Sequence, residues 1–356
     1  MPKPKRQKRK GTRSPRARTK SRRQHYGWTP DDADARDHRF APPRHGAVPA
    51  KFSLRDAFPA AYYQGQLKSC AANAVAAAIQ YDRIKQGLPS GTVTPSRLFI
   101  YYNARAIEGR VAWNAPTRVR NVVKGVAKYG ACFEGRLADQ WPYVIKRFKR
   151  RPRHLCFKAA KKDRALHYSR VARDIEHFKA CLASGYPFVF GFWAYEGIEA
   201  RKVSKTGAIP LPKAHEKQLG GHVVLAVGYD DTKRHILIRN SWGTKWGKGG
   251  YGTMPYAYVL NPDLANDFWT IRVMSVSDGK SARSQAAAGS PGIRLIRQLA
   301  QLRQKRPAQF ALGDDQGRPP PRPGCDADHL DHVGHAALEP RDVGGTELRR
   351  QMGGHT

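Results

Sequence analysis

The chain has 356 residues, enough for one large domain or two modest ones, and its 64 Lys and Arg against 28 Asp and Glu give a formal net charge of +36. No stretch approaches the roughly 18 uninterrupted apolar residues of a membrane span, and the start of the chain lacks the apolar core of a secretory signal. These features exclude a membrane-spanning protein and favour a cytoplasmic one. Export by another route and a nuclear address within residues 3–10 stay open as alternatives.

The two ends of the chain differ in composition from its middle. Residues 1–25 hold 12 Lys or Arg and no acid, and residues 275–356 are rich in Gly, Pro and Ala. Neither end has enough apolar side chains to offset the entropy of ordering, so we expect two disordered tails around a domain at residues 26–274. Within the second tail, residues 293–304 could form a short basic amphipathic helix, although a fraying segment is the simpler interpretation.

The excess of positive charge predicts affinity for anionic partners. The basic tail at residues 1–25 is expected to attract nucleic acid or acidic protein without sequence preference, more weakly as salt rises. A second basic run, residues 146–173, has 12 basic side chains, one acid and three interleaved aromatic residues. A solvated basic insertion is the commoner explanation of such a run, and a nucleic-acid surface is the alternative.

Helical patterns dominate the first half of the domain. Residues 70–86 carry apolar side chains at helical spacing and are followed by Gly87, which predicts a buried helix with a glycine stop. A second helix, capped by Thr94, is expected to run through Arg105. A third is expected over residues 117–129.

The second half of the domain has strand patterns instead. Short apolar runs at residues 187–192, 223–227 and 235–238 are separated by Gly and Asp turns, which is typical of buried strands. A helical half, about residues 51–185, followed by a strand-rich half, about residues 186–274, favours two lobes with a cleft between them.

The cysteines do not form a disulfide or zinc pattern. There are five of them, an odd number, with no Cys-x-x-Cys pair. They are Cys70, Cys132, Cys156, Cys181 and Cys325. We therefore expect a reducing compartment, no structural metal and no organic cofactor.

Three short motifs together supply the parts of a thiol acyl-transfer site. Cys70 opens the first predicted helix, where the helix dipole and free amides favour a thiolate. Far downstream, His222 follows two glycines at the start of an apolar strand, and Asn240 begins an Asn-Ser-Trp-Gly sequence. Such a reaction needs a thiolate, a base that ionises it, a group that orients the base and donors for the oxyanion.

The order Cys, His, Asn and the glycine-rich run at residues 239–252 resemble the papain-like cysteine peptidases, especially a bacterial branch of that family. Residues 27–31, 95–103 and 141–143 add to the resemblance, which extends over residues 26–273. It implies an α+β fold with an N-terminal helical lobe, a C-terminal antiparallel β-barrel-like lobe and an active-site cleft between them. It also implies an endopeptidase-type hydrolase that acts on peptides or proteins.

The resemblance assigns roles to individual residues. Cys70 would be the nucleophile, His222 the base and acid, and Asn240 the group that orients the imidazole. Gln64 would supply one donor of the oxyanion hole, and Trp242 would cover the bond between His222 and Asn240. Each residue also has a plain structural explanation, such as an inert buried thiol or a solvated loop amide, but their combination favours catalysis.

The sequence departs from the family pattern around the nucleophile. Leu67 replaces a cysteine that usually staples the cleft loop, Lys68 places a cation beside the thiol, and Ala71 replaces an aromatic residue. Lys68 should favour the thiolate. The family's inhibitory prosegment is not evident, because residues 26–63 are too few to contain it and are expected to be integral to the domain.

Two other functions remain as alternatives. The first is a protein that binds nucleic acid or an anionic surface and retains only a peptidase scaffold. The second is a transamidase, which would form the same thioester and transfer it to an amine instead of water.

Overall fold

The protein is represented by a computed structural model that describes residues 25–42, 48–88, 93–161 and 166–273. The expected tail before residue 25, the tail after residue 274, the helix expected at residues 293–304 and Cys325 lie outside the described residues.

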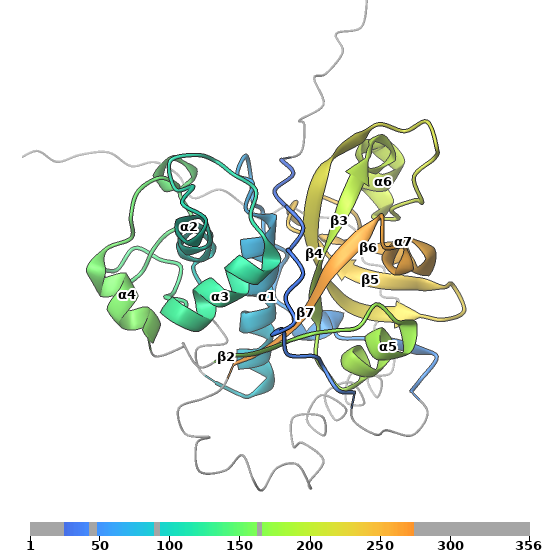
Figure 1. Ribbon diagram of the computed structural model, residues 1–356, viewed down its shortest axis with the longest axis horizontal. Helices are drawn as coiled ribbons and strands as arrows, with labels where there is room; N and C mark the ends of the chain where they lie inside the picture. Colours follow the sequence, from blue (N-terminus) through green and yellow to red (C-terminus); the bar gives the residue numbers. More distant parts are fainter. Residues whose placement is uncertain (1–24, 43–47, 89–92, 162–165, 274–356) are drawn as a thin grey trace, which may run out of the picture. The chain divides into compact units, whose positions relative to one another are not determined.

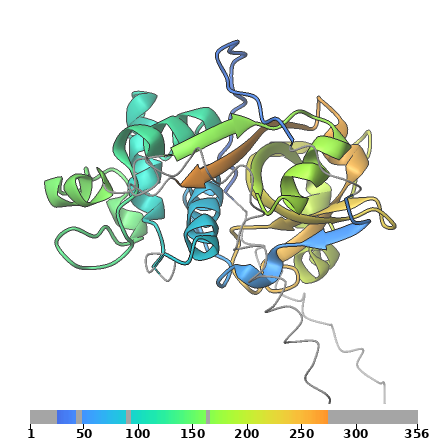
Figure 2. The same ribbon diagram turned by 90° about the horizontal axis from the view of Figure 1, so that it is seen from below.

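Three helices form the first half of the domain. They are α1 (Cys70–Lys85), α2 (Arg97–Ile107) and α3 (Val119–Tyr129), and they contact one another. Every residue of α1 from Cys70 to Arg83 is buried, because this alanine-rich helix lies between the other helices and the sheet (Figure 1 and Figure 2). Small side chains on all faces of α1 allow this close packing.

The start of α2 differs from the expectation. Ser96 caps this helix instead of Thr94, since its hydroxyl accepts a hydrogen bond from the backbone N–H of Phe99 at 3.2 Å. Pro95 therefore lies before the cap and not in the first turn.

The remaining helices are short. They are α4 (His154–Ala160), α5 (Ile175–Ala183), α6 (Arg201–Thr206) and α7 (Tyr256–Leu260), with 3₁₀ turns η1 (Arg55–Ala57), η3 (Ile145–Arg147) and η5 (Glu196–Glu199). Among the described residues, no helix combines the length and the apolar character that crossing a membrane requires.

Seven strands form one antiparallel sheet. They are β1 (Lys51–Ser53), β2 (Leu166–Arg170), β3 (Phe188–Tyr195), β4 (Gln218–Asp230), β5 (His235–Arg239), β6 (Tyr251–Pro255) and β7 (Ala265–Val273). Their order is β2-β7-β3-β4-β5-β6, and β1 pairs with β4. The expected barrel-like lobe is thus an open sheet. The predicted α+β fold with a helical lobe and a strand-rich lobe is confirmed.

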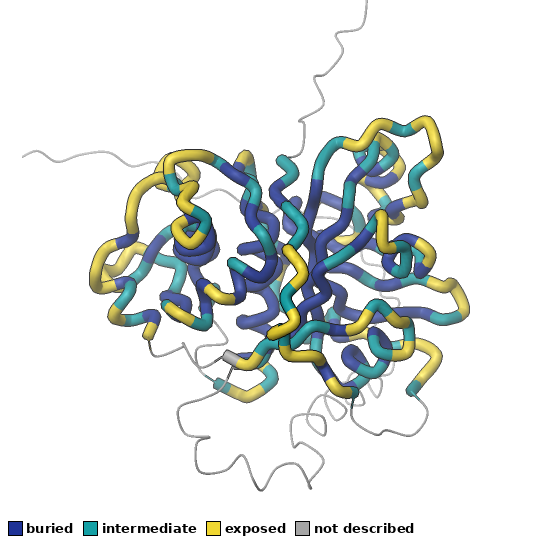
Figure 3. The backbone as a smooth tube through the Cα atoms, viewed as in Figure 1, coloured by how far each residue is buried: buried dark blue, intermediate teal, exposed yellow. Residues whose placement is uncertain are grey.

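The core lies where α1 meets the sheet (Figure 3). Strand β4 is the centre of this contact, since it pairs with β1, β3 and β5 and also packs against α1. From its fourth to its thirteenth residue, β4 is buried. Strands β1 and β2, which precede residue 186, also join the sheet.

The N-terminal segment runs between the helices and the sheet (dark blue in Figure 1). We call residues 25–40 the strap. Trp28 in the strap forms isolated β-bridges with Thr117 in the helical lobe and with Gly221 in β4. Trp28 is 3% exposed and Phe40 is 7% exposed, so both ends of the strap are anchored in the core.

Candidate active site

Cys70 is the first residue of α1, as the sequence predicts. The carbonyl of the preceding Ser69 accepts hydrogen bonds from the backbone N–H of Asn73 at 3.0 Å and from its side-chain amide at 2.9 Å. This pair of bonds fixes the start of the helix and therefore the position of the sulfur. Backbone amides of Val223 and Gly27 also lie near the sulfur. Cys70 is completely buried.

His222 lies in β4 and is held by the loop after β5. Its Nε2 lies 2.8 Å from Oδ1 of Asn240. The same Oδ1 accepts the backbone N–H of Ser241 at 2.8 Å, which identifies it as the acceptor and places the imidazole hydrogen on Nε2. Nδ1 of His222 is left as an acceptor, and it has no hydrogen-bond partner.

Aromatic rings enclose the imidazole. The ring of Trp242 lies 4.7 Å from that of His222 at an angle of 30°, and the ring of Tyr26 in the strap approaches edge-on at 6.2 Å. Phe192 packs from β3 at 5.6 Å. His222 consequently has no exposed surface.

The side-chain amide of Gln64 has a fixed orientation. Its Oε1 accepts the hydroxyl of Ser241 at 2.6 Å, so its Nε2 must be the donor at the other end. Nε2 donates to the carbonyl of Leu67 and to the carbonyl of His25 in the strap, both at 2.9 Å. The carbonyl oxygen of His25 in the strap therefore accepts a hydrogen bond from Gln64 Nε2, the group expected to donate to the oxyanion.

The strap is bound to both the sheet and the helical lobe through its main chain. The backbone N–H groups of Gly27 and Trp28 donate to the carbonyl of Gly221 in β4 at 2.8 and 2.9 Å. On the helical side, Thr117 N–H donates to the Gly27 carbonyl at 3.0 Å, and Thr29 N–H donates to the Thr117 carbonyl at 3.3 Å. The strap, which belongs to the segment expected to be integral to the domain, thus lies beside the candidate catalytic residues.

Burial sets the protonation of the two reactive groups. It raises the pKa of the Cys70 thiol to about 11, against a smaller opposite effect of nearby backbone amides. It lowers the pKa of His222 to about 4, against a smaller effect of the hydrogen bond to Asn240. The helix terminus and Lys68 were expected to favour the thiolate, but with the strap in place burial outweighs them. Both groups are neutral at pH 7 in this arrangement.

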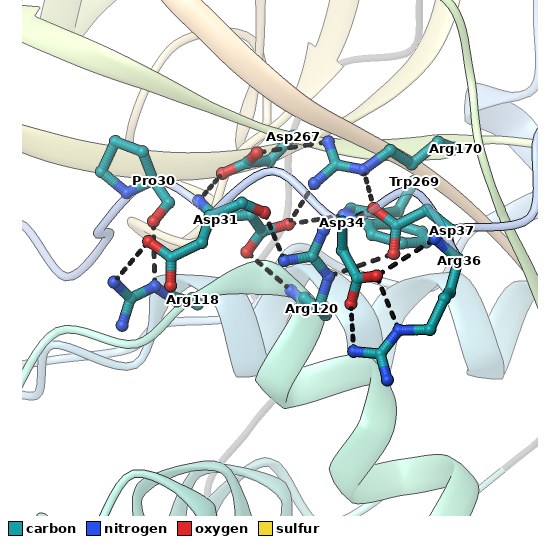
Figure 4. Close-up of polar contacts among 11 residues, drawn as sticks. Pro30, Asp31, Asp34, Arg36, Asp37, Arg118, Arg120, Arg170, Asp267 and Trp269 are labelled. Atoms are coloured by element: carbon teal, nitrogen blue, oxygen red, sulfur yellow. Dashed lines mark hydrogen bonds and ion pairs between the residues drawn. The ribbon is translucent and has the colours of Figure 1, made fainter.

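The outer part of the strap is held by charged groups (Figure 4). The guanidinium of Arg170 contacts Asp31 at 3.0 Å, Asp37 at 2.5 Å and Asp267 in β7 at 3.4 Å. Arg120 in α3 also pairs with Asp37, and its backbone N–H donates to Asp31 at 3.0 Å. These contacts join residues far apart along the chain, so the sequence alone does not predict them.

The basic run at residues 146–173 is not a uniform surface. Around η3 and α4 its cations are exposed, whereas Arg170 points inward to the strap and Arg173 donates to the carbonyl of Ala265 at 3.1 Å. Part of the charge that suggested an anion-binding surface is thus neutralised within the fold. In the described part of the chain, no cluster of three or more His, Cys, Asp or Glu is arranged to hold a metal ion.

Comparison with known proteins places this chain in a family. Residues 111–263 match the sequence model of the papain family cysteine proteases. An uncharacterized peptidase C1-like protein of Acanthamoeba polyphaga mimivirus is 41% identical over 217 residues, which cover 59% of this chain and 68% of the viral protein. The chain belongs to the papain family of cysteine proteases.

Solved structures agree with this assignment. The papain-family chain described here is 42% identical to xylellain, a cysteine protease from Xylella fastidiosa, with a TM-score of 0.64, over 70% of this chain and 96% of xylellain. Procathepsin L 3 of the Tenebrio molitor larval midgut is 16% identical with a TM-score of 0.50, which supports the fold alone. The protein is a cysteine-type hydrolase, and peptides or proteins are its substrates.

Proposed function

We propose that this papain-family protease hydrolyses peptide bonds with Cys70 as the nucleophile, His222 as the base and acid, and Asn240 as the group that orients the imidazole. The observation that carries the proposal is the fixed imidazole. Its Nε2 lies 2.8 Å from Asn240 Oδ1, and its Nδ1 is buried without a partner. Strand β4, which carries His222, packs against α1, which begins with Cys70, and this contact supports a role for the free nitrogen as acceptor of the thiol proton.

The reaction would proceed through a thioester. The Cys70 sulfur adds to the substrate carbonyl while His222 takes the thiol proton and delivers it to the leaving amine. Water, deprotonated by the same imidazole, then releases the acid and restores the thiol. The Nε2 group of Gln64 and the backbone N–H of Cys70 would stabilise the oxyanion, and the His25 carbonyl at 2.9 Å from Nε2 supports this use of Gln64.

A substrate can reach Cys70 only after the strap leaves the cleft, because neither Cys70 nor His222 has exposed surface. The departure of the strap would also activate the pair. With water admitted, the burial that raises the pKa of Cys70 and lowers the pKa of His222 is relieved, and a thiolate–imidazolium pair becomes accessible near neutral pH.

The test uses the full chain and a fluorogenic peptide library. Cys70→Ala is expected to remove cleavage completely and to keep the fold, measured by circular dichroism, because it deletes the nucleophile and only one sulfur atom. Cys181→Ala in α5 is the matched control, since Cys181 is also fully buried but belongs to another part of the core. Unchanged cleavage by the Cys70→Ala protein would falsify the assignment.

A further inference from the structure

A series of hydrogen bonds connects α1 to the loop that carries Gln64. Tyr143 donates its hydroxyl to the main-chain carbonyl of Gln64 at 2.9 Å. Because Tyr143 has a single hydroxyl hydrogen, the 2.7 Å bond between its oxygen and the hydroxyl of Ser69 must be donated by Ser69. Ser69 accepts the side-chain amide of Asn73 at 3.1 Å. Every bond of the series therefore donates towards Gln64, one of the proposed donors to the oxyanion.

Arg97 in α2 begins this series. Its guanidinium donates to Oδ1 of Asn73 at 3.1 Å, so the amide nitrogen of Asn73 is the end that faces Ser69. A bidentate pair with Glu134, at 2.9 and 2.6 Å, fixes the plane of the guanidinium. The guanidinium also lies over the ring of Tyr143, 4.0 Å from its centroid. We call these four side chains the loop network: Arg97, Asn73, Ser69 and Tyr143.

The position of Arg97 is unusual for a cation. Arg97 is the first residue of α2, where the helix dipole disfavours positive charge, and it is only 8% exposed. Burial lowers the pKa of Arg97, but the hydrogen bonds and the charge of Glu134 outweigh burial, so the pKa is raised. Stability alone does not explain a charge at this place, because a buried ion pair often contributes no more than apolar packing.

Ser69 connects the loop network to the second proposed oxyanion donor, the backbone N–H of Cys70. The peptide group between Ser69 and Cys70 is planar, so its C=O and its N–H point in opposite directions. Asn73 holds this C=O with its backbone N–H at 3.0 Å and with its side-chain amide at 2.9 Å. The same two bonds therefore set the direction of the Cys70 N–H, which begins the helix and has no acceptor within it.

The loop between Gln64 and Cys70 has no covalent brace. Leu67 stands where the family pattern has a cysteine, and all cysteines among the described residues are free thiols. Besides its contacts with Ser69 and Gln64, the loop network contacts the residue just before the loop, since Arg97 donates to the carbonyl of Tyr63 at 3.3 Å. Both ends of the loop are thus held by hydrogen bonds from the same four side chains.

We propose that the loop network positions the oxyanion hole, by keeping the Nε2 of Gln64 and the backbone N–H of Cys70 aligned with the oxyanion. Its side chains are positioning residues, because they act through these two donors. This rests on the proposed function, since the oxyanion forms only when Cys70 attacks a carbonyl. An oxyanion develops in the transition state and not in the bound substrate, so poorly aligned donors lower kcat and leave KM nearly unchanged.

The first experiment removes one hydroxyl from the loop network. In the full chain, Tyr143→Phe keeps the ring over Arg97 and deletes the donor to the Gln64 carbonyl. With a fluorogenic peptide, kcat is expected to fall about tenfold or more and KM to stay within about threefold. Tyr229→Phe is the matched control, since its hydroxyl also donates to a main-chain carbonyl, that of Pro49 at 2.7 Å, near the far end of β4. Equal kcat values for the two variants overturn the proposal.

The second experiment separates alignment of the donors from a general loss of structure. Iodoacetamide alkylates Cys70 at a saturated carbon and forms no oxyanion, whereas a peptide aldehyde adds to the thiol through its carbonyl and forms one. In Tyr143→Phe, the alkylation rate is expected to stay within about threefold of the native rate. The affinity for the aldehyde, measured by protection of Cys70 from alkylation, is expected to fall about tenfold.

Both reactions of Cys70 need the strap to open, so the ratio of the two changes is independent of strap opening. Equal changes in alkylation and in aldehyde affinity would mean that Tyr143→Phe acts on the fold or on the strap, and would contradict a positioning role.

The third experiment tests whether the hydroxyls act as one series. Ser69→Ala in the native background is expected to lower kcat about fivefold, because Tyr143 loses the bond that orients its hydroxyl. In the Tyr143→Phe background the same change is expected to lower kcat less than about twofold, since the Ser69 hydroxyl has already lost its acceptor. An equal effect of Ser69→Ala in both backgrounds would show that the hydroxyls act independently and would contradict a connected network.

The outcomes distinguish this proposal from the proposed function. If the native chain cleaves peptides and Tyr143→Phe matches the Tyr229→Phe control, the peptidase function stands and the positioning role fails. If the native chain cleaves no peptide, the proposed function fails, and the comparison of the aldehyde with iodoacetamide still decides whether the loop network aligns the two donors.

Discussion

The two halves of the strap are held in different ways. Residues 25–29, the cleft half, lie between the helices and the sheet, where the cleft is expected, and bind mainly through the main chain, to Gly221 in β4 and to Thr117. Residues 30–40, the outer half, bind mainly through carboxylates, to Arg120 and Arg170. The cleft half lies beside Cys70 and His222, and the outer half contributes charge.

The strap is therefore held by two separate kinds of contact, neutral contacts in the cleft half and ion pairs in the outer half. The cleft half is held by main-chain hydrogen bonds and by the buried indole of Trp28, which are neutral contacts. The ion pairs of the outer half contribute to the free energy with which the strap binds the domain. This contribution depends on pH and salt. Changes in the two halves should therefore have distinguishable effects.

The largest effect is expected from Gly27→Ala in the cleft half. A Cβ atom at Gly27 would lie 2.2 Å from the carbonyl oxygen of Lys68, a backbone atom that cannot turn away. The cleft half should be expelled, and thiol labelling of Cys70 should rise about a hundredfold. Gly125→Ala in α3 is the control, since its Cβ would meet only ordinary contacts at 3.6 Å. Equal labelling of the two variants would show that the strap does not control access.

A smaller effect on strap opening is expected from a change of pH. His222 and Asp31 shift the equilibrium between the closed and open forms in opposite directions. His222 has a pKa of about 4 when closed and an ordinary value near 6.5 when open, so opening takes up a proton and is favoured as pH falls from 6.5 to 4. Asp31 has a pKa raised to about 6, first by burial and then by Asp267, against an ordinary value near 3.8. It therefore binds a proton more tightly when closed and opposes opening over nearly the same range.

The two contributions oppose each other in the native chain. Between pH 7 and 4.5, opening is expected to rise by several tens of fold in Asp31→Asn, where the His222 contribution remains alone, and to rise less in the native protein, where Asp31 opposes it. Hydrogen exchange at the amides of Gly27 and Trp28, corrected for intrinsic rates, measures this. A steep rise in the native protein and a flat profile in Asp31→Asn would contradict the opposite effects assigned to His222 and Asp31.

The smallest effect on the site is expected from Arg120→Ala in the outer half. It removes a mostly buried partner of Asp37, so the melting temperature should fall by several degrees. Cys70 labelling should rise less than tenfold, because the main-chain bonds of the cleft half remain. Arg36→Ala is the control, since its pair with Asp34 is exposed. A hundredfold rise in labelling would mean that the two halves are not separable.

The helices and the candidate catalytic residues were predictable because their signals are local. An alanine-rich helix opened by Cys70, the glycines before His222 and the sequence that begins at Asn240 can each be recognised over a few residues. The open sheet was less predictable, since strand order depends on contacts between distant segments, such as β1 with β4.

The strap left no comparable signal because its position depends on partners far along the chain. Trp28 and Asp267 are 239 residues apart, and Asp31 and Arg170 are 139 apart. Two hints were present in the sequence. Four aspartates fall within residues 31–37 of a strongly basic chain, and Gly191 interrupts a run of large apolar residues in a predicted strand. In the structure, Asp31 and Asp37 pair with Arg120 and Arg170, and Gly191 leaves room for the indole of Trp28.

The strap also changes the meaning of any affinity measured on this protein. Because it is covalently attached to the domain that it covers, it competes at a local concentration that dilution cannot lower. A molecule that binds only the open form shows an apparent Kd equal to its true Kd divided by the open fraction. Inhibitors ranked on the full chain will all seem weaker by one common factor, and a compound that tolerates the seated strap will stand out from the rest.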